Sequence, residues 1–138
     1  MQRIREIRAK KERLSGFLKS SGLQAVVLGR VSNFSWLTAG GSDVVAQSSE
    51  VGPALIYYDG VNSVLVTDVI EAPRLSAEEI VGTEFEVKAF PWYYSTAATN
   101  FLRTICKGKA VASDIPLGKP FKPLPLPRNL SKRPQFYG

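Results

Sequence analysis

Residues 24–29 read QAVVLG, a short, continuous apolar run rich in branched side chains. Such a run is typical of a strand that is buried on both faces of a sheet. Before it, residues 2–21 carry apolar side chains at helical spacing among charged ones, and Gly22 stands where a left-handed helix end favours glycine. The start of the chain therefore predicts an amphipathic helix that leads into a central strand.

A short helix and a β-hairpin are expected next. Ser32 could cap a helix that carries Trp36, and the glycine pair at 40–41 would then end it. Residues 54–58 and 63–67 are rich in β-forming side chains and are joined by a turn signal of hairpin length. We expect these two strands to pair antiparallel.

The following segments predict two helices and two strands. Residues 68–80 start with a capping Asp68, although Pro73 limits how regular a helix there can be. In residues 85–89, apolar side chains alternate with charged ones, as in a strand with one solvated face. Residues 95–106 have the wide apolar face of a packed helix, and 110–113 form one more short, buried run.

This order of elements predicts the fold class. Buried strands separated by helices, with one hairpin among them, favour a three-layer α/β/α domain with a mixed five-stranded sheet over residues 1–115. After it, residues 116–134 hold six of the nine prolines together with five basic residues. We therefore expect residues 116–138 to form an extended, proline-rich basic arm or linker instead of a packed element.

Composition excludes several kinds of chemistry. The 138 residues contain no histidine, which removes imidazole bases, Ser-His and Cys-His nucleophile pairs and the commonest metal ligand. The single cysteine, Cys106, has no partner for an intrachain disulfide and is expected to be a buried core residue. No apolar run approaches the roughly 20 residues of a membrane span, and no secretory signal is visible, so we predict a cytoplasmic protein without membrane contact.

The net charge of +6 belongs to the two ends of the chain. Residues 1–19 carry seven basic and two acidic groups (+5), and residues 107–138 carry seven and one (+6). Residues 20–106, with four basic and nine acidic groups, are acidic (−5). A basic composition of this kind does not by itself indicate nucleic-acid binding, so a nucleic-acid binder that uses the two basic ends is the least favoured alternative.

Few residues are candidates for chemistry or binding. The carboxylates lack any known metal-ligand spacing, so no metal site and no cofactor are expected in this chain. What remains is an aromatic set near segment ends, where side chains either bind a ligand or partner or cap the core: Phe34, Trp36, Trp92, Tyr93 and Tyr94. Both alternatives stay open from the sequence.

One region resembles a known family. Its matching stretches are RL at 13–14, SGLQAVVL at 21–28, SN at 32–33, WLT at 36–38, PALI at 53–56 and VLVTD at 64–68. Together they resemble the N-terminal domain of the creatinase, prolidase and Xaa-Pro aminopeptidase family. Gln24 replaces the acid of the family pattern, Trp36 replaces its tyrosine and Ala39 its glycine. The resemblance covers roughly residues 5–115.

The resemblance implies a ribonuclease H-like sheet and a noncatalytic role. In the family, two divalent metals are held by a C-terminal pita-bread domain, and the N-terminal domain contacts a neighbouring subunit and walls the substrate entrance. We therefore expect a noncatalytic domain of a proline-specific metallopeptidase-like protein, which associates as a homo-oligomer or with a catalytic domain that this chain lacks. The candidate entrance or interface residues are Asn33, Trp36, Thr38, Gly40 and Gly41 from the motif, with Trp92 and Tyr93 from the aromatic set. The alternative is a free-standing module that binds a small molecule or a peptide.

Overall fold

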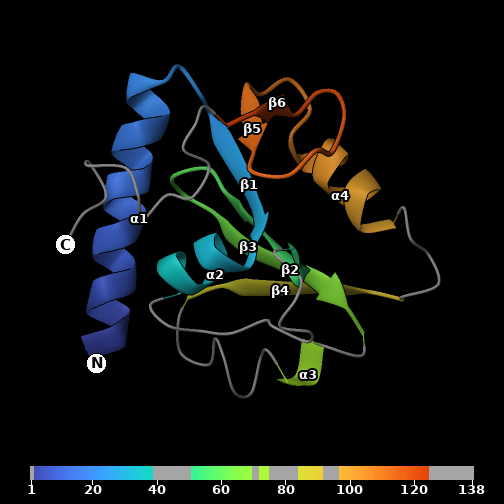
Figure 1. Ribbon diagram of the computed structural model, residues 1–138, viewed down its shortest axis with the longest axis horizontal. Helices are drawn as coiled ribbons and strands as arrows, with labels where there is room; N and C mark the ends of the chain where they lie inside the picture. Colours follow the sequence, from blue (N-terminus) through green and yellow to red (C-terminus); the bar gives the residue numbers. More distant parts are fainter. Residues whose placement is uncertain (1, 39–50, 70–71, 75–83, 92–96, 125–138) are drawn as a thin grey trace.

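The computed structural model describes residues 2–38, 51–69, 72–74, 84–91 and 97–124. Figure 1 shows a sheet flanked by helices. The helices are α1 (Gln2–Ser20), α2 (Val31–Leu37), α3 (Ala72–Arg74) and α4 (Ala97–Ile105). The strands are β1 (Ala25–Arg30), β2 (Val51–Tyr58), β3 (Ser63–Asp68), β4 (Glu86–Phe90), β5 (Val111–Ser113) and β6 (Lys122–Pro123).

The described strands form one mixed sheet in the order β4-β3-β2-β1-β5-β6. The β1/β2 and β2/β3 pairs are antiparallel, which confirms the expected hairpin. The β1/β5, β3/β4 and β5/β6 pairs are parallel. The predicted α/β class is confirmed, with six strands in place of the five expected.

Two apolar clusters fill the space on the two faces of the sheet. One joins the sheet to Leu14 and Phe17 of α1 and to Phe34 of α2. The other joins it to Leu102 of α4 and to Cys106, which is fully buried as predicted. Figure 1 shows α1 on one side of the sheet and α4 on the other, which confirms the three layers. This arrangement follows from the apolar stripe that each helix presents to the sheet.

Strand β1 is the buried centre that the opening sequence predicted. Its residues 25–29 are all buried, because β2 and β5 pair with its two edges and helices cover its faces. Gly22, before this strand, has a φ of 69°, the left-handed value expected at the end of α1. The amphipathic helix and the central strand are therefore confirmed.

Two expected helices differ in detail. Ser32 does not cap α2, because the helix already begins at Val31 and its cap residue is Arg30. Asp68 does not begin a helix, because it ends β3 and pairs with Phe90 of β4. The described helix after it, α3, spans only Ala72–Arg74, and the remainder of the expected helix, residues 75–83, lies outside the described residues.

The proline-rich segment is packed up to Leu124, which corrects the expected boundary at residue 116. Lys122 and Pro123 form β6 beside β5, and the Leu124 N–H donates to the Ser113 carbonyl over 2.9 Å. Phe121 and Leu124 are buried in the core. Proline is tolerated here because β6 lies at the edge of the sheet, where one side of the strand needs no donor. Residues 125–138 lie outside the described residues.

Candidate functional site

The predicted site residues divide into two groups. Asn33, Trp36 and Thr38 lie in or directly after α2, and all three are buried. The others, Gly40, Gly41, Trp92 and Tyr93, lie outside the described residues, as does Tyr94. The structure therefore brings the first three together in or directly after one helix. It does not describe the positions of the other four.

Thr38 ends α2. Its hydroxyl and its N–H both donate to the Phe34 carbonyl, over 2.7 and 3.0 Å. The Thr38 carbonyl in turn accepts a hydrogen bond from Nε of Arg3 on α1, over 2.9 Å. These bonds satisfy backbone groups that a helix end leaves open, so Thr38 has a structural role.

Trp36 belongs to the core cluster between α1 and the sheet, with only 8% of its surface exposed. The ammonium group of Lys10 lies 5.4 Å from the centroid of its ring, which closes that side of the indole. An interface residue offers its area to a partner, and this side chain has little area left to offer. The burial favours the core-filling alternative that the sequence left open for Trp36.

Asp114 organises the carboxyl ends of β1 and β5. Its Oδ1 accepts from the Gly29 N–H over 2.7 Å, and its Oδ2 accepts from the Arg30 N–H over 3.0 Å. The amide of Asn33 also donates to Oδ2, over 2.7 Å. Burial raises the pKa of Asp114, while the three N–H donors act in the opposite direction. The network joins the end of β5 to the start of α2.

Asp114 is not among the site residues expected from the sequence. A signal was present, since Asp114 directly follows a short buried strand, where polar side chains of α/β sheets gather. Its partners could not be named, because Gly29 and Asn33 are more than 80 residues away in the chain.

Gly29 permits a close approach next to this network. A Cβ at this position would lie 2.6 Å from Cδ1 of Ile115 and 2.7 Å from Cδ2 of Leu55. Both distances are shorter than a carbon–carbon contact allows. The absence of a side chain at Gly29 therefore lets the segment after β5 pack directly on β1.

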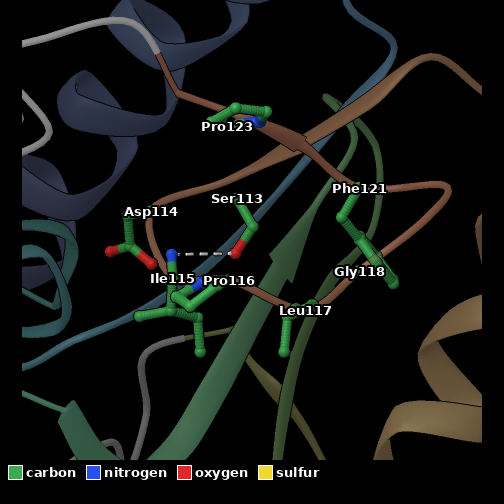
Figure 2. Close-up of a pocket in the computed structure, with 8 residues that line it drawn as sticks. All are labelled: Ser113, Asp114, Ile115, Pro116, Leu117, Gly118, Phe121 and Pro123. Carbon is green, nitrogen blue, oxygen red and sulfur yellow. Dashed lines mark hydrogen bonds between the residues drawn. The ribbon is translucent and has the colours of Figure 1, made fainter.

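A pocket opens beside Asp114. It has a volume of about 330 Å³ and is lined by the segment that runs from the end of β5 to β6: Ser113, Asp114, Ile115, Pro116, Leu117, Gly118, Phe121 and Pro123. Figure 2 shows these residues around the loop, with the Asp114 carboxylate turned away from Leu117, Gly118 and Phe121. The pocket lies at the carboxyl end of parallel strands, where open α/β sheets bind ligands.

A second polar cluster lies at the opposite end of the sheet. The Tyr57 hydroxyl donates to Oδ2 of Asp59 over 2.8 Å, and Lys109 Nζ lies 2.7 Å from that hydroxyl and 3.4 Å from Oδ2. Oδ1 of Asp59 accepts the N–H groups of Val61 and Asn62 in the hairpin turn. Burial raises the pKa of Tyr57. The phenol is therefore not activated as a base or nucleophile, and the cluster ties the hairpin to Lys109.

Asp59 should make the free energy of unfolding depend on pH in the acidic range. Partial burial alone would raise the pKa of Asp59, but the N–H groups of Asn62 and Val61 and the Tyr57 hydroxyl lower it from 3.8 to about 2. A carboxyl whose pKa falls on folding stabilises the protein above its unfolded pKa, and this stability is lost as pH falls through the folded pKa. We expect the free energy of unfolding to decrease by ~2 kcal/mol from this group between about pH 4 and pH 2.

Urea titrations across this pH range measure the effect. Asp59→Asn should flatten the decrease, and Glu86→Gln, which removes an exposed carboxylate on β4, should not. An equal acid sensitivity in wild type and Asp59→Asn would contradict the prediction.

The described residues contain no group of three His, Cys, Asp or Glu side chains that could hold a metal ion. They also contain no helix that is long and apolar enough to cross a membrane.

Several solved structures have a similar architecture, and two of them illustrate the match. An Xaa-Pro aminopeptidase from Streptococcus pyogenes matches with a TM-score of 0.53 and 13% identity, over 78% of this chain and 73% of that chain. An Xaa-Pro dipeptidase from Bacillus anthracis matches with a TM-score of 0.54 and 14% identity, over 78% of this chain. This chain shares their fold. The resemblance that the sequence indicated is confirmed at the level of the fold.

The match covers 26% of the dipeptidase chain. The present chain therefore corresponds in fold to a part of that larger protein. No family model matches the sequence, and no curated protein matches it.

Proposed function

We propose that this chain is a noncatalytic domain of a proline-specific, metallopeptidase-like protein, where it serves subunit association and shapes the substrate entrance. The observation that carries the proposal is the fold, which matches an Xaa-Pro aminopeptidase and about a quarter of an Xaa-Pro dipeptidase. Bond cleavage and the metal ions that it needs belong, in this proposal, to a separate catalytic domain.

The composition of the chain supports the noncatalytic part of the proposal. Peptide hydrolysis by a metal centre needs several ligands arranged around an open position. The sequence has no histidine and one cysteine, and that cysteine is buried with its pKa raised by desolvation to about 11. Asp114 and Asp59, the two buried or partly buried carboxylates described above, are already occupied by N–H and O–H donors.

The purified chain should show no cleavage of an Xaa-Pro dipeptide, with or without added Mn²⁺, Co²⁺ or Zn²⁺, because its sequence has no histidine and its described residues hold no group of side chains for a metal. Product release measured by chromatography tests this. A full-length Xaa-Pro peptidase serves as the positive control. Metal-dependent cleavage that stays with the protein through two orthogonal purification steps would contradict the proposal.

The association part of the proposal needs its own measurement. Sedimentation of the chain over a hundredfold range of concentration should show a species larger than the 15.1 kDa monomer. A monomer at every concentration would reject self-association and leave a covalently linked catalytic domain as the partner to be tested by co-expression.

A further inference from the structure

The pocket beside the end of β5 has the size of a small-molecule site. Its volume of about 330 Å³ exceeds the ~150 Å³ of an engineered apolar cavity that binds benzene. It also reaches the lower end of the range for ligand pockets, which begins near ~300 Å³. A ligand of one or two rings would fill it.

The chemistry of the lining selects the kind of ligand. Most of the lining is apolar, with Ile115, Leu117 and Phe121 as the largest side chains. Asp114 is the one charged residue among the described lining residues, and its carboxylate points away and accepts three N–H groups from β1 and α2. The pocket therefore presents no ionic group, which favours an uncharged molecule with an apolar body.

One buried donor remains in the pocket. The side chain of Ser113 is almost fully buried, at 2% exposure, and its Oγ accepts the Ile115 N–H over 3.2 Å (Figure 2). Within the described part of the chain, the Ser113 hydroxyl accepts this one hydrogen bond and donates none. A buried hydroxyl without an acceptor is costly, so a ligand that brings an acceptor to this point gains affinity.

The rim is held in place by α4. Arg103 Nη2 donates to the Leu117 carbonyl over 3.2 Å, which fixes the loop over the apolar cluster below α4. A pocket whose wall is fixed in advance loses little entropy when a ligand enters.

We propose that this pocket binds a small, uncharged carbonyl compound, with the apolar body between Leu117 and Phe121 and the carbonyl oxygen accepting the Ser113 hydroxyl proton. The proposal is independent of the peptidase-like role. It concerns a different segment from α2 and Thr38, where the described candidate entrance residues Asn33, Trp36 and Thr38 lie.

A matched pair of probes tests the hydrogen bond. Acetophenone carries the carbonyl, and α-methylstyrene replaces it with a methylene group of the same shape. Titration followed by amide NMR shifts of the whole chain should show both compounds at residues 113–123. Ser113→Ala should weaken acetophenone binding by about threefold to tenfold and leave α-methylstyrene binding unchanged, because only the ketone loses a partner.

Two further variants keep the test decisive. Leu117→Trp should abolish binding of both probes by filling the pocket, and Val61→Trp, on the exposed hairpin, should change neither. If Ser113→Ala does not fold, Ser113→Cys replaces it, since a thiol is a weak donor. Absence of shifts at residues 113–123, shifts confined to another region, or equal weakening of both probes by the Ser113 variant would overturn the proposal.

Discussion

Trp36→Ala should lower the free energy of unfolding by ~3–5 kcal/mol, the usual cost of removing a buried aromatic side chain. The indole fills the space between α1 and the sheet, and its removal leaves a cavity that the backbone of α2 can close only in part. Lys10 also loses the ring against which its ammonium group lies. Urea unfolding followed by circular dichroism measures the change.

Val61→Ala is the matched control for Trp36→Ala. Val61 is 89% exposed, so its truncation should change stability by less than ~0.5 kcal/mol. Sedimentation of the same variants separates a core role from an interface role. A small loss of stability in Trp36→Ala together with weaker self-association would contradict the core role and restore the interface prediction for this residue.

Asp114→Ala should destabilise the protein by ~3 kcal/mol or more. The carboxylate accepts the N–H groups of Gly29 and Arg30 and the amide of Asn33, and the substitution leaves all three donors without this acceptor near the end of β1. Unsatisfied buried donors cost more than the hydrogen bonds themselves contribute. Because the network joins β5 to α2, we expect amide exchange to accelerate first in these two elements.

Two comparisons sharpen the Asp114 experiment. Asp114→Asn keeps one acceptor oxygen and the same shape, so its loss of stability should lie between those of wild type and Asp114→Ala. Glu86→Ala removes an exposed carboxylate from β4 and should have little effect. A loss below ~1 kcal/mol in Asp114→Ala would show that water replaces the carboxylate and that the network does not hold the strand ends together.

Local sequence patterns were enough to predict the α/β class and the order of the elements from α1 to β5. Three local patterns predicted elements that the structure contains. They are the helical spacing of apolar residues in α1, the continuous apolar run of β1 and the turn between β2 and β3. The ends of elements were less certain, as Asp68 shows: its side chain suits a helix cap, but pairing with β4 extends the strand through it.

Which residues meet at the strand ends depends on contacts between distant segments. Asn33 is separated from Asp114 by 81 residues, and neither residue carries a local signal for the other. The same holds for Phe121 and Leu124, whose segment is rich in proline and basic residues and reads as an arm, yet buries both side chains beside β5. The periodicity of apolar residues shows which side of one segment is buried. Burial of a particular carboxylate or aromatic ring also depends on surfaces from distant segments, and these surfaces come together only when the sheet forms.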